Sequence, residues 1–328
     1  MNVMIRGGGV AAACCAHLLG LNRIAVTMAP ADPAPAPVVM LSDMALGLIR
    51  DVFAAPDLFA GLPRITRRIV AWGGGDPVAM PHAATIVAGA AALLPVTETG
   101  GAATTDLTIH AAAPLPGGET RRFGARGATA APVALRDPAD ASDCWIESVE
   151  SGWLFLIPAG TGQAWLLSVG ADMEAALRQS RHVARRVRLA EAPRQSFDPS
   201  PRIACPPSGA DWIGCGTAAI AFDPICGDGT AQAVREAILV SAILAAIGDG
   251  GDAQALRAHH DAMLLATMRR HLQLCAPFYR TGGQGDWWRA AHDALAEGHD
   301  WCTTRLAHAP EPRYMLQGYR LAERRLVS

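Results

Sequence analysis

The sequence predicts an α/β fold with a Rossmann-like lobe, an inserted antiparallel sheet and a C-terminal helical cap. The first observation is a strand–glycine turn–helix–strand pattern over residues 2–28. The second is a strand–turn–helix pattern over residues 212–248, where a glycine-containing turn precedes a long run without a helix breaker. The third is a series of short strand-like segments between these two regions, which favours a separate sheet.

Residues 2–28 fit a βαβ unit whose first strand ends at a glycine triplet and whose helix consists of small residues. The triplet begins the spacing G-x-G-x-x-A, formed by Gly7, Gly8, Gly9 and Ala12. In this spacing Gly7 allows the tight turn, Gly9 lets a pyrophosphate approach the backbone, and Ala12 lets the helix pack closely on the strand. The N-terminus is therefore a predicted dinucleotide site.

The second turn runs from Asp223 to Gly229 with the sequence D-P-I-C-G-D-G. Pro224 fixes its own φ, and the glycines let the backbone come close to a bound group. A helix beginning near Gly229 directs free N–H groups and a partial positive charge into the turn. The segment is predicted to be a backbone site for an anion or an electron-rich ring, and the alternative is an ordinary strand–loop–helix connection.

Together the two segments resemble the flavoprotein monooxygenase and flavin-dependent halogenase superfamily, in which GxGxxG lies near the start and GD-A-A-x-x-x-D-P-x-x-G-x-G near the end. Residues 106–113 resemble its strand ending in D-A-T-G, residues 152–158 its G-W-x-x-x-I-P strand, and residues 69–73 the first strand of its substrate sheet. The resemblance covers residues 1–248. It implies FAD, held by Gly7, Gly8, Gly9, Ala12, Thr217, Asp223, Pro224, Gly227, Asp228 and Gly229.

Three departures from the family pattern concern the predicted FAD site. Residues 27–30, Thr-Met-Ala-Pro, lack the acid that usually binds the adenosine ribose at the end of the second strand. The register from Asp223 places Thr217 where the family has the aspartate of its GD motif. The D-A-T-G segment becomes His-Ala-Ala-Ala over residues 110–113. These differences keep a cofactor-free binding protein as an alternative.

Composition and charge exclude several other functions. The net charge of −2 argues against broad nucleic-acid binding, which needs a basic face. Residues 237–248 are apolar but too short to span a bilayer, and the N-terminus is expected to be mature sequence without a signal peptide. We therefore expect a cytoplasmic protein without a membrane partner.

The eight cysteines contain no C-x-x-C pair, so the spacing predicts buried free thiols and no metal site. Cys226 lies inside the second turn, where it is either a small packing residue or a reactive thiol. The sequence contains no lysine. Flavin-dependent tryptophan halogenases use an active-site lysine to relay hypochlorous acid, so this chemistry is excluded.

Other local patterns predict the remaining elements. Helices are expected over residues 42–53, with Ser42 as the cap, over 173–187, and over 252–274, where Pro277 ends or kinks the helix. A second C-terminal helix carries three tryptophans, and a strand or arm follows near residues 314–320. His82 is a candidate acid–base group but more often such a histidine is structural.

The predicted domains are an FAD-binding lobe of residues 1–60, 105–113 and 200–248, a substrate sheet of residues 64–104 and 114–199, and a helical cap of residues 249–328. The resemblance implies a monooxygenase that oxygenates an electron-rich aromatic substrate through a flavin C4a-hydroperoxide, with NAD(P)H or a separate flavin reductase as electron donor. The substrate is a small molecule or a tryptophan of a partner protein, as for the flavoprotein maturases of tryptophylquinone enzymes. A flavin-fold oxidase or reductase without oxygenation is the alternative enzyme. The sequence identifies no catalytic residue.

Overall fold

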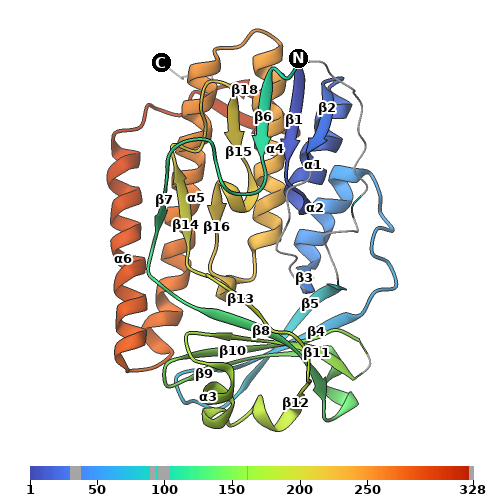
Figure 1. Cartoon of the computed structure of the whole chain (residues 1–328), viewed down its shortest axis with the longest axis vertical. Helices are drawn as coiled ribbons and strands as arrows, with labels where there is room; N and C mark the ends of the chain where they lie inside the picture. The colour runs from blue at the N-terminus through green and yellow to red at the C-terminus, as the bar shows by residue number, and fades with distance from the viewer. Residues whose placement is uncertain (30–37, 89–93, 95–103, 161, 325–328) are drawn as a thin grey trace.

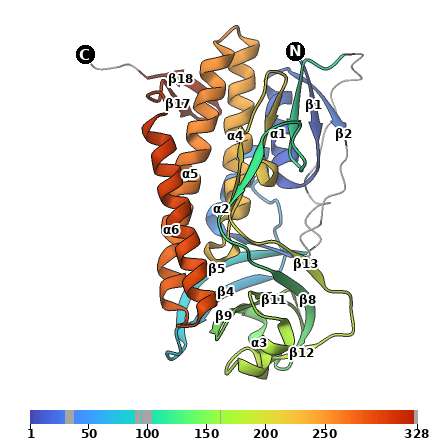
Figure 2. The ribbon, with the colours of Figure 1, turned by 60° about the vertical axis from the view of Figure 1, so that its left-hand side comes forward.

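The computed structural model describes residues 1–29, 38–88, 94, 104–160 and 162–324. A parallel sheet with its helices forms one end of the molecule, and a large mixed sheet forms the other (Figure 1). Two long helices, α5 (Ala253–Thr281) and α6 (Asp286–Ala307), run along one side of both sheets (Figure 2). The predicted fold class, with a Rossmann-like lobe, an inserted sheet and C-terminal helices, is confirmed.

The Rossmann-like lobe is a four-stranded parallel sheet in the order β15-β6-β1-β2. Its strands are β1 (Asn2–Arg6), β2 (Ala25–Ala29), β6 (Leu107–His110) and β15 (Trp212–Gly214). The helix α1 (Gly9–Leu21) connects β1 to β2, as the sequence predicts. Small residues such as Ala12 and Cys15 are fully buried on α1, which lets it pack against α4 (Gly229–Gly248).

The inserted sheet has nine strands, and eight of them follow the order β12-β8-β11-β10-β9-β4-β5-β3, with β13 paired to β8. These strands are β3 (Val38–Ser42), β4 (Arg64–Ala71), β5 (Val78–Ala88), β8 (Ala128–Leu135), β9 (Asp143–Val149), β10 (Gly152–Pro158), β11 (Gln163–Val169), β12 (Val187–Leu189) and β13 (Gln195–Phe197). The sheet is not wholly antiparallel, because β4 and β9 run parallel. β3 lies at its edge, although the sequence places these residues in the first lobe.

Two smaller sheets complete the strand topology. One has the order β16-β14-β7 and joins β7 (Glu119–Arg122), β14 (Arg202–Cys205) and β16 (Ile220–Ala221). The other is the hairpin of β17 (Tyr314–Gln317) and β18 (Arg320–Glu323), which confirms a strand near the C-terminus. The domain boundaries themselves stay a prediction.

The helix expected over residues 173–187 is shorter, because α3 (Met173–Gln179) ends at Ser180. The buried carboxylate of Glu147 accepts hydrogen bonds from the backbone N–H groups of Arg181, His182 and Val183. These bonds satisfy donors that the helix would otherwise use, and a short helical turn, η3 (Ala184–Arg186), follows. The hydrogen bonds to Glu147 on β9 therefore end α3 earlier than the sequence pattern predicts.

The C-terminal cap is a pair of packed helices, α5 (Ala253–Thr281) and α6 (Asp286–Ala307). α5 continues past Pro277 to the break at Gly282, so the proline does not end it. Trp288 is buried between α6 and the nine-stranded sheet, and its indole N–H donates to the carbonyl of Val149 at 3.0 Å. The cap is thus attached to the sheet by a tryptophan.

The first lobe contains two further helices, one with a side-chain cap and one that is long and apolar. α2 (Asp43–Phe53) begins as expected, with the Ser42 hydroxyl accepting from the N–H of Ala45. α4 is long and apolar enough by length and composition to cross a membrane, but 61% of that window is buried inside the protein. It packs against α1, α2 and α5, so its hydrophobic surface serves the core.

Candidate functional site

The glycine turn before α1 is open to a ligand. α1 has Gly8 as its N-cap, and no side chain accepts its first N–H groups. A Cβ atom added at Gly8 or Gly9 would meet no described residue within 4 Å, and Gly9 has a φ of +79°. Free N–H groups, the positive end of the helix dipole and open space together suit a pyrophosphate.

Gly7 is required for a different reason, which is close packing. Its φ is +119°, and an added Cβ would lie 2.9 Å from the backbone nitrogen of Ala112. The segment after β6, which the sequence matches to D-A-T-G, therefore lies directly on the glycine turn. Only a residue without a side chain allows this approach.

A third segment reaches the first turn of α1 through Gly216. The φ of Gly216 is +58°, and a Cβ there would lie 2.8 Å from the Cβ of Ala11. Its N–H donates to the Glu236 carboxylate at 2.8 Å, and burial raises the pKa of Glu236 well above its ordinary value. Thr217 follows and is exposed, although the residues on both sides of it are buried. The Thr217 hydroxyl is thus available to a ligand beside α1.

The second turn combines a short helical turn with the start of α4. η5 (Pro224–Cys226) ends at Gly227, whose φ is +66°, and α4 begins at Gly229. The N-cap Asp228 makes no capping bond, because its carboxylate binds Arg235 at 2.9 Å instead. A Cβ at Gly229 would meet nothing within 4 Å. This helix N-terminus is also uncapped by a side chain and open.

The Asp223 side chain supports this turn from inside the protein. Its carboxylate is fully buried and accepts hydrogen bonds from Arg126 at 2.8 Å, from the Tyr279 hydroxyl at 2.6 Å and from the N–H of Ile225 at 3.0 Å. The Arg126 guanidinium also lies over the Tyr279 ring, 4.4 Å from its centre. Asp223 therefore shapes the turn, and its carboxylate is not exposed to a ligand. The sequence did not reveal Arg126 or Tyr279, which lie far away in the chain.

The nine-stranded sheet reaches the same turn through Arg68 of β4. Its Nη2 atom lies 3.5 Å from the Cβ position of Gly227, and its buried Nε has no partner among the described residues. Nη2 lies 3.0 Å from Nε2 of His82 on β5. Burial and the neighbouring arginine lower the pKa of His82, which favours the neutral imidazole at pH 7. Arg68 is a candidate ligand-binding group that sequence reasoning missed.

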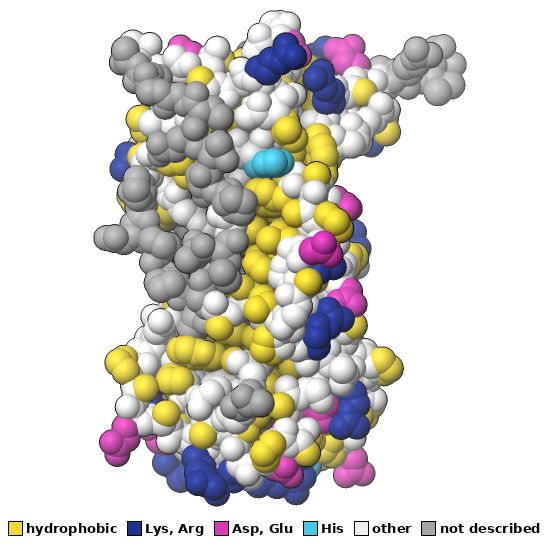
Figure 3. All heavy atoms as spheres, turned by 90° about the vertical axis from the view of Figure 1, so that its right-hand side faces the viewer, with side chains coloured by type: hydrophobic (Ala, Val, Ile, Leu, Met, Phe, Trp, Pro, Cys, Tyr) yellow, Lys and Arg dark blue, Asp and Glu magenta, His cyan; other side chains and the backbone are white. Residues whose placement is uncertain are grey.

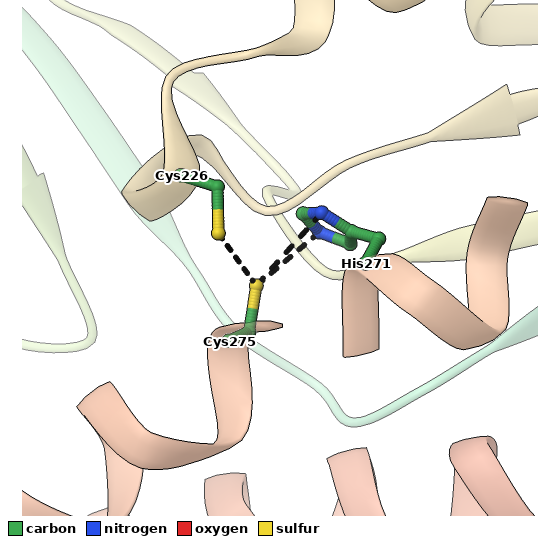
Figure 4. Close-up of side chains that lie close together, drawn as sticks. All are labelled: Cys226, His271 and Cys275. Carbon is green, nitrogen blue, oxygen red and sulfur yellow. Dashed lines mark hydrogen bonds between the residues drawn. The ribbon is translucent and has the colours of Figure 1, made fainter. Parts of the chain in front are cut away.

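Cys226, His271 and Cys275 form a cluster beside the turn (Figure 4). The two sulfur atoms are 3.3 Å apart, and the Cys275 sulfur lies 3.4 Å from Nε2 of His271. One ligand atom from each of these three residues lies within 4.8 Å of the others, so the cluster could hold a metal ion. It is the one such group found among the described residues. The sequence spacing could not show it, because Cys226 precedes the other two by more than forty residues.

The described residues also form a cavity and a hydrophobic surface band. A cavity of about 250 Å³ lies between residues 206–210 and α5, and none of the predicted FAD-binding residues lines it. Trp153, on the G-W-x-x-x-I-P-like strand, is fully buried and donates to Tyr279, so it belongs to the core. On the face shown in Figure 3, hydrophobic side chains form a band running from the upper lobe toward the nine-stranded sheet.

Several solved structures share this fold, and some of them are flavin-dependent or complexed with FAD. The chain is similar to peptidyl tryptophan dihydroxylase QhpG, essential for tryptophylquinone cofactor biogenesis, with a TM-score of 0.75 and 19% identity over 98% of this chain and 86% of that chain. It is similar to the flavin-dependent halogenase CmlS, with a TM-score of 0.68 and 18% identity over 95% of this chain and 73% of that chain. It also resembles a Klebsiella pneumoniae HpxO variant complexed with FAD, with a TM-score of 0.63 and 12% identity over 94% of this chain and 98% of that chain.

No protein-family model matches the sequence, and no curated protein matches it. The structural likeness confirms the fold that the sequence predicts.

Proposed function

We propose that the chain is an FAD-dependent monooxygenase. The observation that carries this proposal is the pair of glycine-rich turns, each followed by a helix whose first N–H groups have no side-chain cap. The fold places the first turn at the end of a parallel strand, which is where dinucleotides bind in Rossmann-like sheets. The likeness to flavoenzymes over nearly the whole chain supports the same function.

The residues present fit FAD at both ends. Gly7, Gly8, Gly9 and Ala12 would hold the pyrophosphate at the open N-terminus of α1. The exposed Thr217 hydroxyl would bind the ribityl chain, in place of a carboxylate. The backbone of Pro224, Gly227, Asp228 and Gly229 would hold the ring, and Asp223 would support them from inside.

The chain's own residues would prepare this site for oxygen chemistry. When reduced by NAD(P)H or by a separate flavin reductase, FAD supplies the activation of molecular oxygen. Arg68 and the N-terminus of α4 would stabilise negative charge on the reduced ring. The buried network of Asp223, Arg126 and Tyr279 would hold the turn rigid, since each member is fixed by the others.

We propose an electron-rich aromatic substrate, either a small molecule or a tryptophan of a partner protein. The similarity to a peptidyl tryptophan dihydroxylase supports the second choice. Lysine-dependent halogenation is not proposed, because the sequence has no lysine to hold hypohalous acid.

Product analysis in isotopically labelled oxygen tests this proposal. FAD-loaded protein is incubated with NADPH, a flavin reductase, ¹⁸O₂, chloride, and a panel of phenols, indoles and tryptophan-containing peptides. We expect an ¹⁸O-containing product that requires the folded protein, without any chlorinated product. Hydrogen peroxide as the sole product would support the oxidase alternative, and an enzyme-dependent chlorine isotope pattern would refute the exclusion of halogenation.

A further inference from the structure

We propose that Cys226 and Cys275 are a redox-active thiol pair, in which Cys226 is oxidised by a hydroperoxide and Cys275 resolves it to a disulfide. The pair connects the predicted flavin turn to the cap helix α5. The proposal goes beyond the oxygenase function and does not depend on FAD binding.

The first support is the distance between the two sulfur atoms, which is 3.3 Å. A disulfide has a sulfur–sulfur bond of about 2.05 Å, so the atoms need to approach by little more than about 1 Å. Cys226 lies at the end of a short helical turn followed by Gly227, where side-chain rotation is not blocked by a regular helix. The geometry therefore brings the two thiols close to bonding distance.

The second support is an unequal environment for the two thiols. Cys226 is half-buried, whereas Cys275 is fully buried. The hydrogen bond from Cys275 lowers the pKa of Cys226, with help from His271 and against burial and Asp223. The pKa of Cys275 is raised well above its ordinary value by the same contact and by burial. The accessible Cys226 thiolate is suited to attack the peroxide, and the buried Cys275 thiol is suited to form the disulfide with the oxidised Cys226.

The position of His271 argues for this redox role over a metal site. Its Nε2 atom accepts a hydrogen bond from the N–H of Asp223 at 2.8 Å, so this lone pair is already used. The ring is held parallel to Phe222, with centres 4.0 Å apart. Two thiolates on one tetrahedral zinc ion would lie about 3.8 Å apart, from zinc–sulfur bonds of about 2.3 Å. A metal bound through Nε2 would therefore require the histidine to lose its backbone donor, and two thiolate ligands would require the sulfurs to separate.

The reaction balances with a hydroperoxide as the oxidant. The Cys226 thiolate attacks the terminal peroxide oxygen, the O–O bond breaks, and the sulfur becomes a sulfenic acid while the other oxygen leaves as hydroxide or alkoxide. The Cys275 sulfur then displaces the sulfenic oxygen, and its proton and a second proton leave with that oxygen as water. Both thiols are oxidised by one electron each, and the peroxide accepts the two electrons.

The chain contains a matched control in Cys15 and Cys215. Their sulfur atoms are 3.8 Å apart, both residues are fully buried, and the Cys15 sulfur also lies beside the carbonyl of Ala237 on α4. The hydrogen bond with Cys15 and burial raise the pKa of Cys215 well above its ordinary value. The two sulfur atoms of this pair are close, but neither cysteine presents an accessible thiolate. Both thiols should therefore stay reduced in hydrogen peroxide.

The test is peptide mapping of fully reduced protein after treatment with hydrogen peroxide, with and without FAD. Cleavage before aspartate separates Cys226 from Cys215. We expect a disulfide between Cys226 and Cys275 and free thiols at Cys15 and Cys215. Iodoacetamide at pH 7 should modify Cys226 more than about tenfold faster than Cys215, because the thiolate is the nucleophile.

Two variants separate the roles of the pair. Cys275→Ser should leave a sulfenic acid on Cys226 that dimedone captures, and Cys226→Ser should leave Cys275 reduced, with far-UV circular dichroism confirming folding. The proposal is overturned if wild-type Cys226 and Cys275 stay thiols in peroxide, or if the buried control pair oxidises equally. It is also overturned if the purified protein contains stoichiometric zinc that Cys275→Ser removes and that protects both thiols.

Discussion

The two glycine-rich turns of this molecule look alike in sequence but are built differently. The turn before α1 consists of backbone and small side chains, and Gly7 and Gly216 are the points where neighbouring segments pack onto it. The turn before α4 is held by a buried network of Asp223, Arg126 and Tyr279, with His271 bound to the Asp223 N–H. One turn presents bare N–H groups, and the other is fixed by side chains from distant segments.

This difference matches two tasks. A pyrophosphate needs closely approaching N–H groups and a helix dipole, which require the absence of side chains. A reactive ring needs a rigid and electrostatically defined surface, which requires supporting side chains that cannot move. At the first turn, substitutions should therefore act by blocking or repelling the bound pyrophosphate. At the second turn, they should act by removing side chains that hold the turn in place.

The largest effect is expected at the first turn, from Gly9→Glu. The open space at Gly9 accepts a side chain, but a carboxylate there would occupy the pyrophosphate position and repel it. We expect a folded protein that retains no FAD after gel filtration, measured by flavin absorbance and far-UV circular dichroism. Gly9→Gln is the matched control for size and backbone strain. Normal flavin content in the glutamate variant would mean that this turn is only structural.

At the second turn, Asp223→Asn should destabilise the folded state by about 3–5 kcal/mol, because it leaves the buried charge of Arg126 without a partner. Urea unfolding provides the free energy. Glu297→Gln breaks the exposed ion pair with Arg121 and should cost less than about 1 kcal/mol. Equal losses in the two variants would show that the buried network does not support the turn.

Glu236→Gln tests the contact that holds Gly216 against α1. The folded-state pKa of Glu236 is raised above the unfolded value near 4.5, so the folded state binds the proton more tightly. Stability should therefore fall as pH rises from about 4.5 toward the folded pKa, by up to about 1.4 kcal/mol per pH unit. Glutamine keeps an acceptor for Gly216 and should remove this decline, giving a higher Tm than wild type at pH 8. An unchanged pH dependence of Tm would exclude Glu236 as its source.

The smallest effect is expected from Thr217→Val, which under the proposed function removes one neutral hydrogen bond to FAD. Such a bond contributes roughly 0.5–1.5 kcal/mol, so FAD affinity should fall by about three- to tenfold. Thr217→Asp should hold or improve the affinity, because Thr217 is exposed and leaves room for a charge-assisted contact. Fluorescence titration of the apo-protein measures both. No change with valine and no binding with aspartate would show that the register is wrong.

The sequence was sufficient for features that depend on local order. The βαβ unit, the start of α2 at Ser42 and the two uncapped turns all follow from residues close together in the chain. The order of the motifs was also enough to identify the fold.

The rest of the site depends on residues that meet only after folding. Arg126, His271, Cys275 and Tyr279 come from strands and helices far from Asp223–Gly229, and no spacing rule connects them. The early end of α3 has the same cause, because Glu147 on β9 competes for its backbone donors. Pro277 did not end α5, since packing against α6 holds the helix through it.

The central proposal is that FAD lies across the two turns, and equilibrium titration of the wild-type apo-protein with FAD is its direct test. Flavin fluorescence and absorbance report binding, and circular dichroism confirms that the protein is folded. We expect saturation at one FAD per chain and competition by ADP, which shares the pyrophosphate. A folded protein that binds no FAD under any of these conditions would contradict it and would favour a cofactor-free binding protein.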